Sequence, residues 1–416
     1  DTGVAPVLAL ADKAKVVVGP DLSFESQAPN LRSLDTYGHG THMAGIIAGR
    51  DNTSGTGFRG VAPDAKLTSI KVGMSNGAVD VTQVMAAIDW VVAHRNDDPA
   101  NPIRVINLSY GLDCLDCLNS PLTFAVKHAD KAGIVVVVAA GNTGAKVTVP
   151  ATSVEPVVVG SLDSLGTTDP SDDVASSFSS NYGRNIMLDV MAPGRSIVSL
   201  RSPGSYADLN NSSARVGDRF FKGSGTSQAA AVTSGAIALY LQKYPKAPVT
   251  QVRNAIRGSA ATNPVNGVGK LDVSRLMAMN ADSGSTSYSS SGTVGTVQAS
   301  RGSNSTVYFG DNTPLSGERD IFGPLSATDW VKASANQTAW NGGSWMGRPW
   351  TGTTWAAASD GQANWAGTTW SGRAWSGRAW SDVAWSGRAW SGRAWSGAFA
   401  SGSGWSGAGW TGSTWQ

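Results

Sequence analysis

The chain has 416 residues, of which 32 are basic and 30 acidic, giving a formal net charge of +2. This balance gives no electrostatic reason to expect binding to nucleic acid or to a membrane surface. No run of about 18 apolar residues occurs, so the sequence predicts no membrane span. The length suits one large domain with an appendage.

The chain opens on an aspartate, Asp1, within the motif Asp-Thr-Gly. A polar and irregular stretch follows to Tyr37, in which three prolines disfavour a long helix. Next comes a histidine between glycines, His39, at the start of a small-residue segment that predicts a helix over 39–48.

Apolar strands and amphipathic helices alternate over the next two hundred residues. The pattern predicts strands over 67–72, 105–109, 134–139 and 156–161 and helices over 81–94, 121–132, 227–243 and 250–257. Such alternation is typical of a mostly parallel sheet covered by helices on both faces. The catalytic groups of such a fold are expected at the carboxyl edge of the sheet.

Small residues precede a lone serine, Ser227, and a run rich in helix formers follows it. The pattern places the serine at a loop-to-helix junction, where free backbone N–H groups and the helix dipole favour developing negative charge. A serine nucleophile also needs a base, and this stretch alone is a weak signal.

Aspartate, histidine and serine occur in that order, each in a glycine-bordered motif, and an apolar strand ends at Asn142 before the serine. These four motifs resemble those of the subtilisin-like serine protease (subtilase) family over about residues 1–280. The resemblance implies a three-layer α/β domain with a mostly parallel sheet. It also implies a secreted serine endopeptidase, and the low charged fraction of 15% agrees with secretion.

The resemblance implies a role for each of the four residues. Ser227 is the nucleophile, His39 the general base and then acid, and Asp1 the carboxylate that orients the imidazole. The side chain of Asn142 and the backbone N–H of Ser227 would stabilise the oxyanion. His42 is expected to pack or to form a hydrogen bond, and His94 and His128 to lie at a surface or a helix end.

Two stretches match those with which the family pairs the substrate backbone, Gly77 and the segment Ser109-Tyr110-Gly111. Thr148 is expected to line the floor of the primary specificity pocket. The expected partners are therefore peptides or proteins, and the match indicates no preference for acidic or basic side chains.

Two other functions remain open. Gly73-Met74-Ser75-Asn76-Gly77 satisfies the G-x-S-x-G pattern after a strand, and Asp116 and His128 follow in the order found in lipases, which describes a serine esterase using Ser75. Alternatively, the protease-like domain is inactive, and the protein binds or attaches to a cell surface through its C-terminal repeats.

The resemblance implies a strand immediately before the aspartate, which this sequence does not contain, so we expect a trimmed chain. If Asp1 is the terminus, its α-ammonium should compete with His39 for the carboxylate. Cys114 and Cys117 form a single C-x-x-C, interpreted as a disulfide-closed loop or as reduced bystanders. No cofactor is required and no metal ligand set is assigned, but the oxygen-rich loop 50–57 allows a structural calcium ion.

The composition divides the chain into a peptidase domain over 1–280, a Ser/Gly-rich linker over 281–305, a connecting segment over 306–339 and a repeat region over 340–416. Tryptophan holds fourteen of the sixteen positions spaced five residues apart from 340 to 415, with Asp360 and Ala400 the exceptions. Such a strict period predicts a repeated backbone unit, for which a β-solenoid is the structural hypothesis, whereas a low-complexity linker is the alternative. Indoles facing outward would suit cell-wall polysaccharide, and indoles facing inward would be architectural.

Overall fold

The computed structural model describes most of the chain up to residue 350, and a short strand beyond it. The described ranges are 1–27, 31–51, 57–77, 79–112, 118–181, 188–265, 267–280, 292–302, 304–307, 314–350 and 375–377. The predicted disulfide at Cys114 and Cys117, most of the loop 50–57, residues 281–291 of the linker and nearly all repeats after Trp350 lie outside these ranges.

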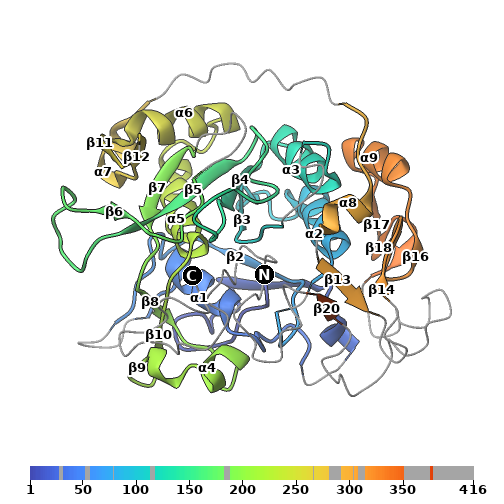
Figure 1. The fold of residues 1–416 in the computed structure, drawn as a ribbon, viewed down its shortest axis with the longest axis horizontal. Coiled ribbons are helices and arrows are strands. Elements are labelled where there is room, and N and C mark those ends of the chain that lie inside the picture. The colour runs from blue at the N-terminus through green and yellow to red at the C-terminus, as the bar shows by residue number, and fades with distance from the viewer. Residues whose placement is uncertain are drawn as a thin grey trace.

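A mostly parallel sheet forms the centre of the molecule (Figure 1). Its strand order is β11-β12-β7-β5-β4-β3, with parallel pairing from β12 to β3 and with β6 antiparallel on β5. The strands are β3 (Val105–Leu108), β4 (Val135–Ala139), β5 (Val157–Asp163), β6 (Val174–Ala175), β7 (Val190–Pro193), β11 (Ala261–Val265) and β12 (Val268–Lys270).

Both faces of this sheet are buried because alternate residues of each strand enter different cores. Val135 and Val137 of β4 pack with α5 (Thr226–Lys243), α6 (Val249–Ser259) and α7 (Val273–Ala278) on their side, chiefly α5 and α6. The helix α1 (His39–Ala48) packs against α5. Val136 and Val138 pack with α2 (Val81–His94) and α3 (Pro121–Lys131) on the other. The predicted three-layer α/β fold is therefore confirmed.

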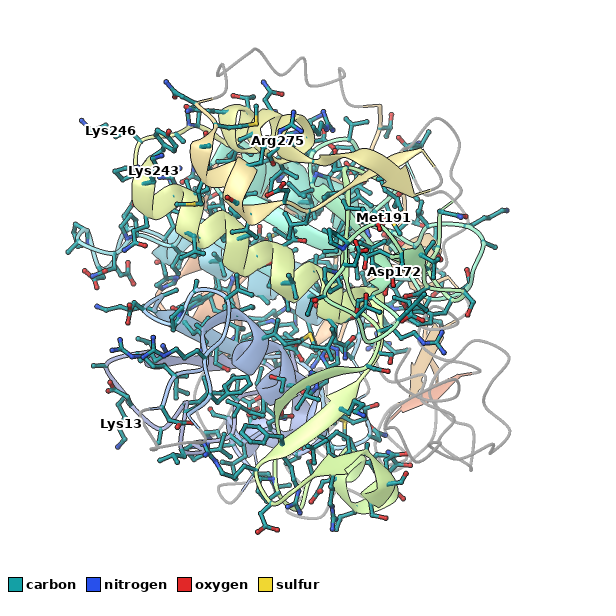
Figure 2. The ribbon with its side chains drawn as sticks, turned by 90° about the vertical axis from the view of Figure 1, so that its left-hand side faces the viewer. Lys13, Asp172, Met191, Lys243, Lys246 and Arg275 are labelled. Carbon is teal, nitrogen blue, oxygen red and sulfur yellow. The ribbon has the colours of Figure 1, made fainter. Side chains whose placement is uncertain are left out.

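Figure 2 shows the same layering from the side, with α5 lying across the sheet. Lys243 and Lys246, near the C-terminal end of α5, extend toward solvent, whereas Met191 of β7 lies inside the molecule and is 2% exposed. No helix among the described residues is both long and apolar enough to cross a bilayer.

Two smaller groups of strands lie beside the main sheet. β1 (Val16–Asp21) pairs in parallel with β2 (Leu67–Lys71), and β1 falls in the stretch that the sequence predicted to be irregular. β8, β10 and β9 form an antiparallel ribbon near α4. The other helices and strands of this part of the molecule are β8 (Ile197–Leu200), β9 (Arg215–Val216), β10 (Phe220–Gly223), α4 (Tyr206–Asn210) and the short 3-10 helices Phe24–Gln27 and Ser212–Ala214.

A cavity of about 730 Å³ separates β2 from β3, and both strands line it. At its end, Asp1 pairs with β2 in the parallel pattern, since its N–H group donates to the Ile70 carbonyl and its own carbonyl accepts from Val72. The expected strand before Asp1 concerns residues outside this sequence, and it stays a prediction.

Residues 292–350, here called the appended segment, pack on the outer surfaces of α2 and α3 (Figure 1). Helix α8 begins inside the predicted linker, so the structure differs from that expectation at the C-terminal end of the linker. The elements are α8 (Val297–Arg301), β13 (Asn304–Val307), β14 (Pro314–Leu315), β15 (Arg319–Asp320), β16 (Gly323–Pro324), α9 (Ala327–Ala335), β17 (Trp340–Asn341), β18 (Ser344–Trp345) and β19 (Arg348–Pro349), and β20 (Trp375–Gly377) pairs with β13 from beyond the segment.

The first three repeat tryptophans face inward. Trp340, Trp345 and Trp350 are 7%, 0% and 1% exposed and belong to the core cluster that includes α2 and α3. Trp340 and Trp345 are cross-strand partners in the β17–β18 pair. Burying an indole removes about 200 Å² from water, worth about 5 kcal/mol each by area, so these repeats are architectural.

A buried carboxylate, Asp89 of α2, joins this segment to the main domain. Its Oδ2 accepts hydrogen bonds from the Nε1 atoms of Trp330 and Trp345, both at 2.8 Å, and its Oδ1 accepts from Ser334. Burial raises the pKa of Asp89 from 3.8 to about 6, and the three donors oppose that shift.

We expect Asp89→Asn to change how stability depends on pH. A carboxyl whose folded pKa is raised stabilises the fold below its unfolded pKa, and this contribution is lost as pH rises through about 6. Asparagine can keep the three contacts, with its amide donating to Ser334, but it does not titrate. Relative to the variant, the parent should lose about 2 kcal/mol of unfolding free energy between pH 4 and pH 7. Urea unfolding of both proteins, each also carrying Ser227→Ala to remove the predicted nucleophile, measures this difference, and parallel pH profiles would contradict it.

Candidate active site

The first residue of α1, His39, contacts the first residue of the chain. His39 Nδ1 lies 2.8 Å from Asp1 Oδ1, and the histidine is fully buried. A carboxylate can only accept hydrogen bonds, so Nδ1 carries the proton and Nε2 is the basic nitrogen of the neutral ring. The structure thus brings together the predicted base and its orienting carboxylate.

The surroundings of His39 keep its imidazole neutral. Burial lowers the pKa of His39 well below 6.5, the Asp35 carboxylate acts in the opposite sense, and the Asp1 amine adds a lowering effect. Burial and nearby Lys71 also lower the pKa of that amine to about 5, so it is neutral at pH 7. The expected competition between this amine and His39 for the carboxylate stays a prediction; the Asp1 nitrogen itself donates to the Ile70 carbonyl at 3.0 Å.

Asp35 organises the start of α1, although sequence reasoning did not single it out. Its Oδ1 accepts from the Gly38 N–H and the Thr2 hydroxyl, and its Oδ2 accepts from the Thr41 N–H, each at 2.7 Å. An aspartate just before a predicted helix start is the signal that could have identified it.

Close approach of the chain at this point also needs a glycine. A Cβ atom at Gly40 would lie 2.0 Å from the Gly3 carbonyl oxygen and 3.1 Å from Asp1 Oδ1. The glycine after His39 therefore lets α1 pack directly on the segment that carries Asp1.

Ser227 is the second residue of α5 and is fully buried. Its backbone N–H belongs to the first turn, where N–H groups have no intrahelical partner. One turn further along each helix, Met43 and Ile46 of α1 form a packed cluster with Ala231 of α5. This packing places the N-terminal ends of the His39 and Ser227 helices side by side.

Two residues at the carboxyl ends of strands hold the start of α5. Asn142 follows β4, and its Oδ1 accepts from the N–H of Thr226 at 2.9 Å and from the Thr226 hydroxyl at 2.8 Å. Because the oxygen is engaged, the Nδ2 end of this amide is turned away from Thr226. Ser109 follows β3 and donates to the Ser227 carbonyl at 3.2 Å.

The predicted substrate-binding residues lie around this centre. A Cβ at Gly111 would come within 2.1 Å of Thr148 Oγ1, so Thr148 packs on the segment that includes Tyr110. Thr148 is buried, and none of the described residues forms a hydrogen bond with its hydroxyl. Gly77 lies in the turn before α2, where its N–H donates to the Met74 carbonyl.

The geometry does not support the esterase alternative. Ser75 lies in a turn rather than at the start of a helix, and its N–H donates to Glu25 at 2.7 Å. His128 lies in the interface with the appended segment, with Nδ1 2.8 Å from the Ser334 hydroxyl. His128 lies in the last turn of α3, which agrees with the helix-end alternative of the prediction, and α9 covers it rather than solvent.

The structure also describes the surroundings of His42 and of the possible metal ligands. Burial lowers the pKa of His42 to about 3, so the ring is neutral and donates from Nε2 to the Phe221 carbonyl at 3.0 Å. No cluster of three or more potential metal-binding side chains occurs in the part of the chain that is described. In the loop 50–57, the described carboxylate of Asp51 pairs with Arg219, and residues 52–56 lie outside the described ranges, so the structural calcium ion stays a prediction.

Comparison with known proteins identifies the family. The profile of the Subtilase family matches residues 21–292, which is more than half of the chain. Serine protease AprX of Bacillus subtilis (strain 168) is 36% identical over 267 residues, covering 62% of this chain and 59% of that protein. Subtilisin DY of Bacillus licheniformis is 37% identical over 269 residues, covering 63% and 82%.

Two solved structures share the fold. Sphericase superposes with a TM-score of 0.52 at 25% identity, covering 62% of this chain and 81% of that one. The S41 Psychrophilic Protease gives 0.52 at 26% identity, covering 65% and 84%. The chain therefore belongs to the subtilase family, a family of serine-type endopeptidases, as its motifs predicted.

Asp35→Ala should destabilise the protein by about 2 kcal/mol, because it leaves buried N–H groups and a hydroxyl without their acceptor. Chemical denaturation in the Ser227→Ala background checks this value. Asp97→Ala, which removes an exposed carboxylate, is the control and should change the stability by less than about 0.5 kcal/mol. Equal stability of Asp35→Ala and the parent would contradict the role given to Asp35.

Proposed function

We propose that the protein is a secreted serine endopeptidase that hydrolyses peptide bonds through Asp1, His39 and Ser227. The hydrogen bond between buried, neutral His39 and Asp1, on a helix packed against α5, whose second residue is Ser227, is the observation that supports it best. His39 Nε2 would take the Ser227 proton as the hydroxyl attacks the substrate carbonyl and would then give it to the leaving amine.

The tetrahedral intermediate would place its negative charge at the start of α5. The Nδ2 group of Asn142 and the backbone N–H of Ser227 would donate to this oxyanion, and the helix dipole adds to the stabilisation. Asp1 would hold the imidazole and stabilise the cation that forms on it. Water, deprotonated by His39 Nε2, would then attack the acyl-enzyme ester and release the acid and the Ser227 hydroxyl. These steps use side-chain and backbone groups of this chain and require no cofactor.

Substrate would bind in an extended form. Gly77 and the Ser109–Gly111 segment would pair with its backbone, and Thr148 would close the primary pocket. This pairing uses main-chain groups, so it permits many substrate sequences. Secretion is supported by the name of a relative, the Extracellular serine proteinase of Thermus sp. (strain Rt41A), which is 36% identical over 254 residues.

An inactive protease-like binding protein remains the alternative proposal. Its predicted attachment to cell-wall polysaccharide would need exposed indoles, whereas Trp340, Trp345 and Trp350 are buried. A structural calcium ion in the loop 50–57 stays a prediction, although the pairing of Asp51 with Arg219 argues against it.

Labelling with a fluorophosphonate separates the protease from the inactive alternative. We expect stoichiometric labelling of the full chain, loss of labelling in Ser227→Ala, and wild-type labelling in the control Ser75→Ala. Because Ser227 is fully buried in the described structure, the reaction also tests whether reagents reach it. A parent protein that takes up no label would overturn the proposed function.

Asn142→Ala should lower kcat for a peptide anilide by about 10² to 10³, with a smaller change in KM, because the oxyanion forms only after binding. Thr226→Val is the control, since it removes one hydroxyl contact of Asn142 but keeps the amide in place. Steady-state kinetics checks both variants. An equal fall in kcat for the two would show that Asn142 acts only by holding Thr226.

A further inference from the structure

A buried arginine of the appended segment forms an ion pair close in sequence to the Gly77 stretch. Arg301, the last residue of α8, is 2% exposed and lies outside the part of the chain that matches the family profile. Its Nε donates to Asp80 Oδ2 at 2.7 Å, and its Nη2 lies 3.4 Å from Asp80 Oδ1. The rest of the guanidinium donates to the carbonyls of Gly317 and Arg319.

Asp80 connects this ion pair to the first substrate-binding stretch. It is the N-cap of α2 and lies three residues after Gly77. Its Oδ1 accepts from the N–H of Thr82 at 3.0 Å and from the Thr82 hydroxyl, and its own N–H donates to Gln83 in a capping box. The turn containing Gly77 is therefore attached to a helix start whose capping carboxylate is neutralised by Arg301.

The ion pair is buried on both sides, with 2% of the Arg301 side chain and 1% of the Asp80 side chain exposed. A buried pair has one favourable geometry, and loss of one partner leaves an uncompensated charge that the surroundings must move to solvate. The element that would move is the start of α2, because Asp80 caps it.

We propose that Arg301 is a positioning residue that, through Asp80, holds the start of α2 and the adjoining Gly77 stretch in place for pairing with substrate. The appended segment then sets the affinity of the protease for extended peptides. This inference rests on the proposed function, because it assigns Gly77 to substrate pairing.

Arg301→Met tests it with one extended peptide substrate and one small reagent that labels the nucleophile. The variant should raise KM about tenfold for an anilide with four residues before the scissile bond and change kcat by less than about twofold. Labelling by a small fluorophosphonate, which does not extend along the Gly77 stretch, should keep its rate. Arg301→Lys keeps the charge without the bidentate fork and should fall between parent and Arg301→Met.

The double variant Asp80→Asn/Arg301→Met separates positioning from simple loss of stability. Asparagine still caps α2, and no charge is left unpaired, so the melting temperature should recover toward that of the parent. The raised KM should remain, because the pair is still absent. Recovery of KM together with the melting temperature would overturn the proposal.

Trp345→Phe is the matched control within the appended segment. It removes one donor to Asp89 on the outer side of α2 and leaves the Arg301–Asp80 pair intact. It should lower the melting temperature without changing KM. An equal rise in KM in this control, or an unchanged KM in Arg301→Met, would overturn the positioning role.

Binding of the same tetrapeptide to Ser227→Ala proteins keeps this test independent of catalysis. The dissociation constant should rise about tenfold when Arg301→Met is added. If the parent takes up no fluorophosphonate but this shift is present, the catalytic proposal fails and the positioning role stands. If labelling succeeds and the shift is absent, only the positioning role fails.

Discussion

The hydrogen bond between His39 and Asp1 is the interaction on which the candidate site depends. It fixes the tautomer of the imidazole, since the carboxylate can only accept, and burial keeps the ring neutral. Other residues fix the positions of both partners. Asp35 accepts hydrogen bonds from N–H groups at the start of α1, and the absence of a side chain at Gly40 lets the Asp1 segment approach.

The remaining parts of the site are brought together by the parallel sheet. Strands β3 and β4 end at the same edge, so Ser109 and Asn142 reach the start of α5 from neighbouring strands. A helix start at this edge provides unpaired N–H groups and a favourable dipole, which is what an oxyanion needs. The site therefore follows from topology as much as from the residues themselves.

The appended segment extends the protein beyond the family domain with buried polar contacts. Three polar residues of the α2 and α3 layer form hydrogen bonds with this segment: the α2 N-cap Asp80, Asp89 of α2 and His128 of α3. Tryptophan donors supply both apolar area and hydrogen bonds, which explains how short strands of two residues can dock stably. The repeats from Trp340 to Trp350 use their indoles for this docking.

Several features follow from the sequence by itself. The family, the alternation of strands and helices and the motifs around His39, Ser227 and Asn142 follow from local patterns, because periodicity and glycine-bordered motifs are written along the chain. Comparison confirmed the family and the fold class. The roles of the individual site residues stay predictions that the geometry supports.

Tertiary structure alone decided the rest. Strand β1 begins with three valines, but Gly19 and Pro20 cut this run short within a mostly polar stretch, and α8 is only five residues long within a Ser/Gly-rich region, so the local signal of each is weak. The five-residue period matches no regular element, and only packing on α2 shows that the first indoles face inward. Contacts such as Arg301 with Asp80 join residues more than two hundred positions apart, and no local pattern carries that information.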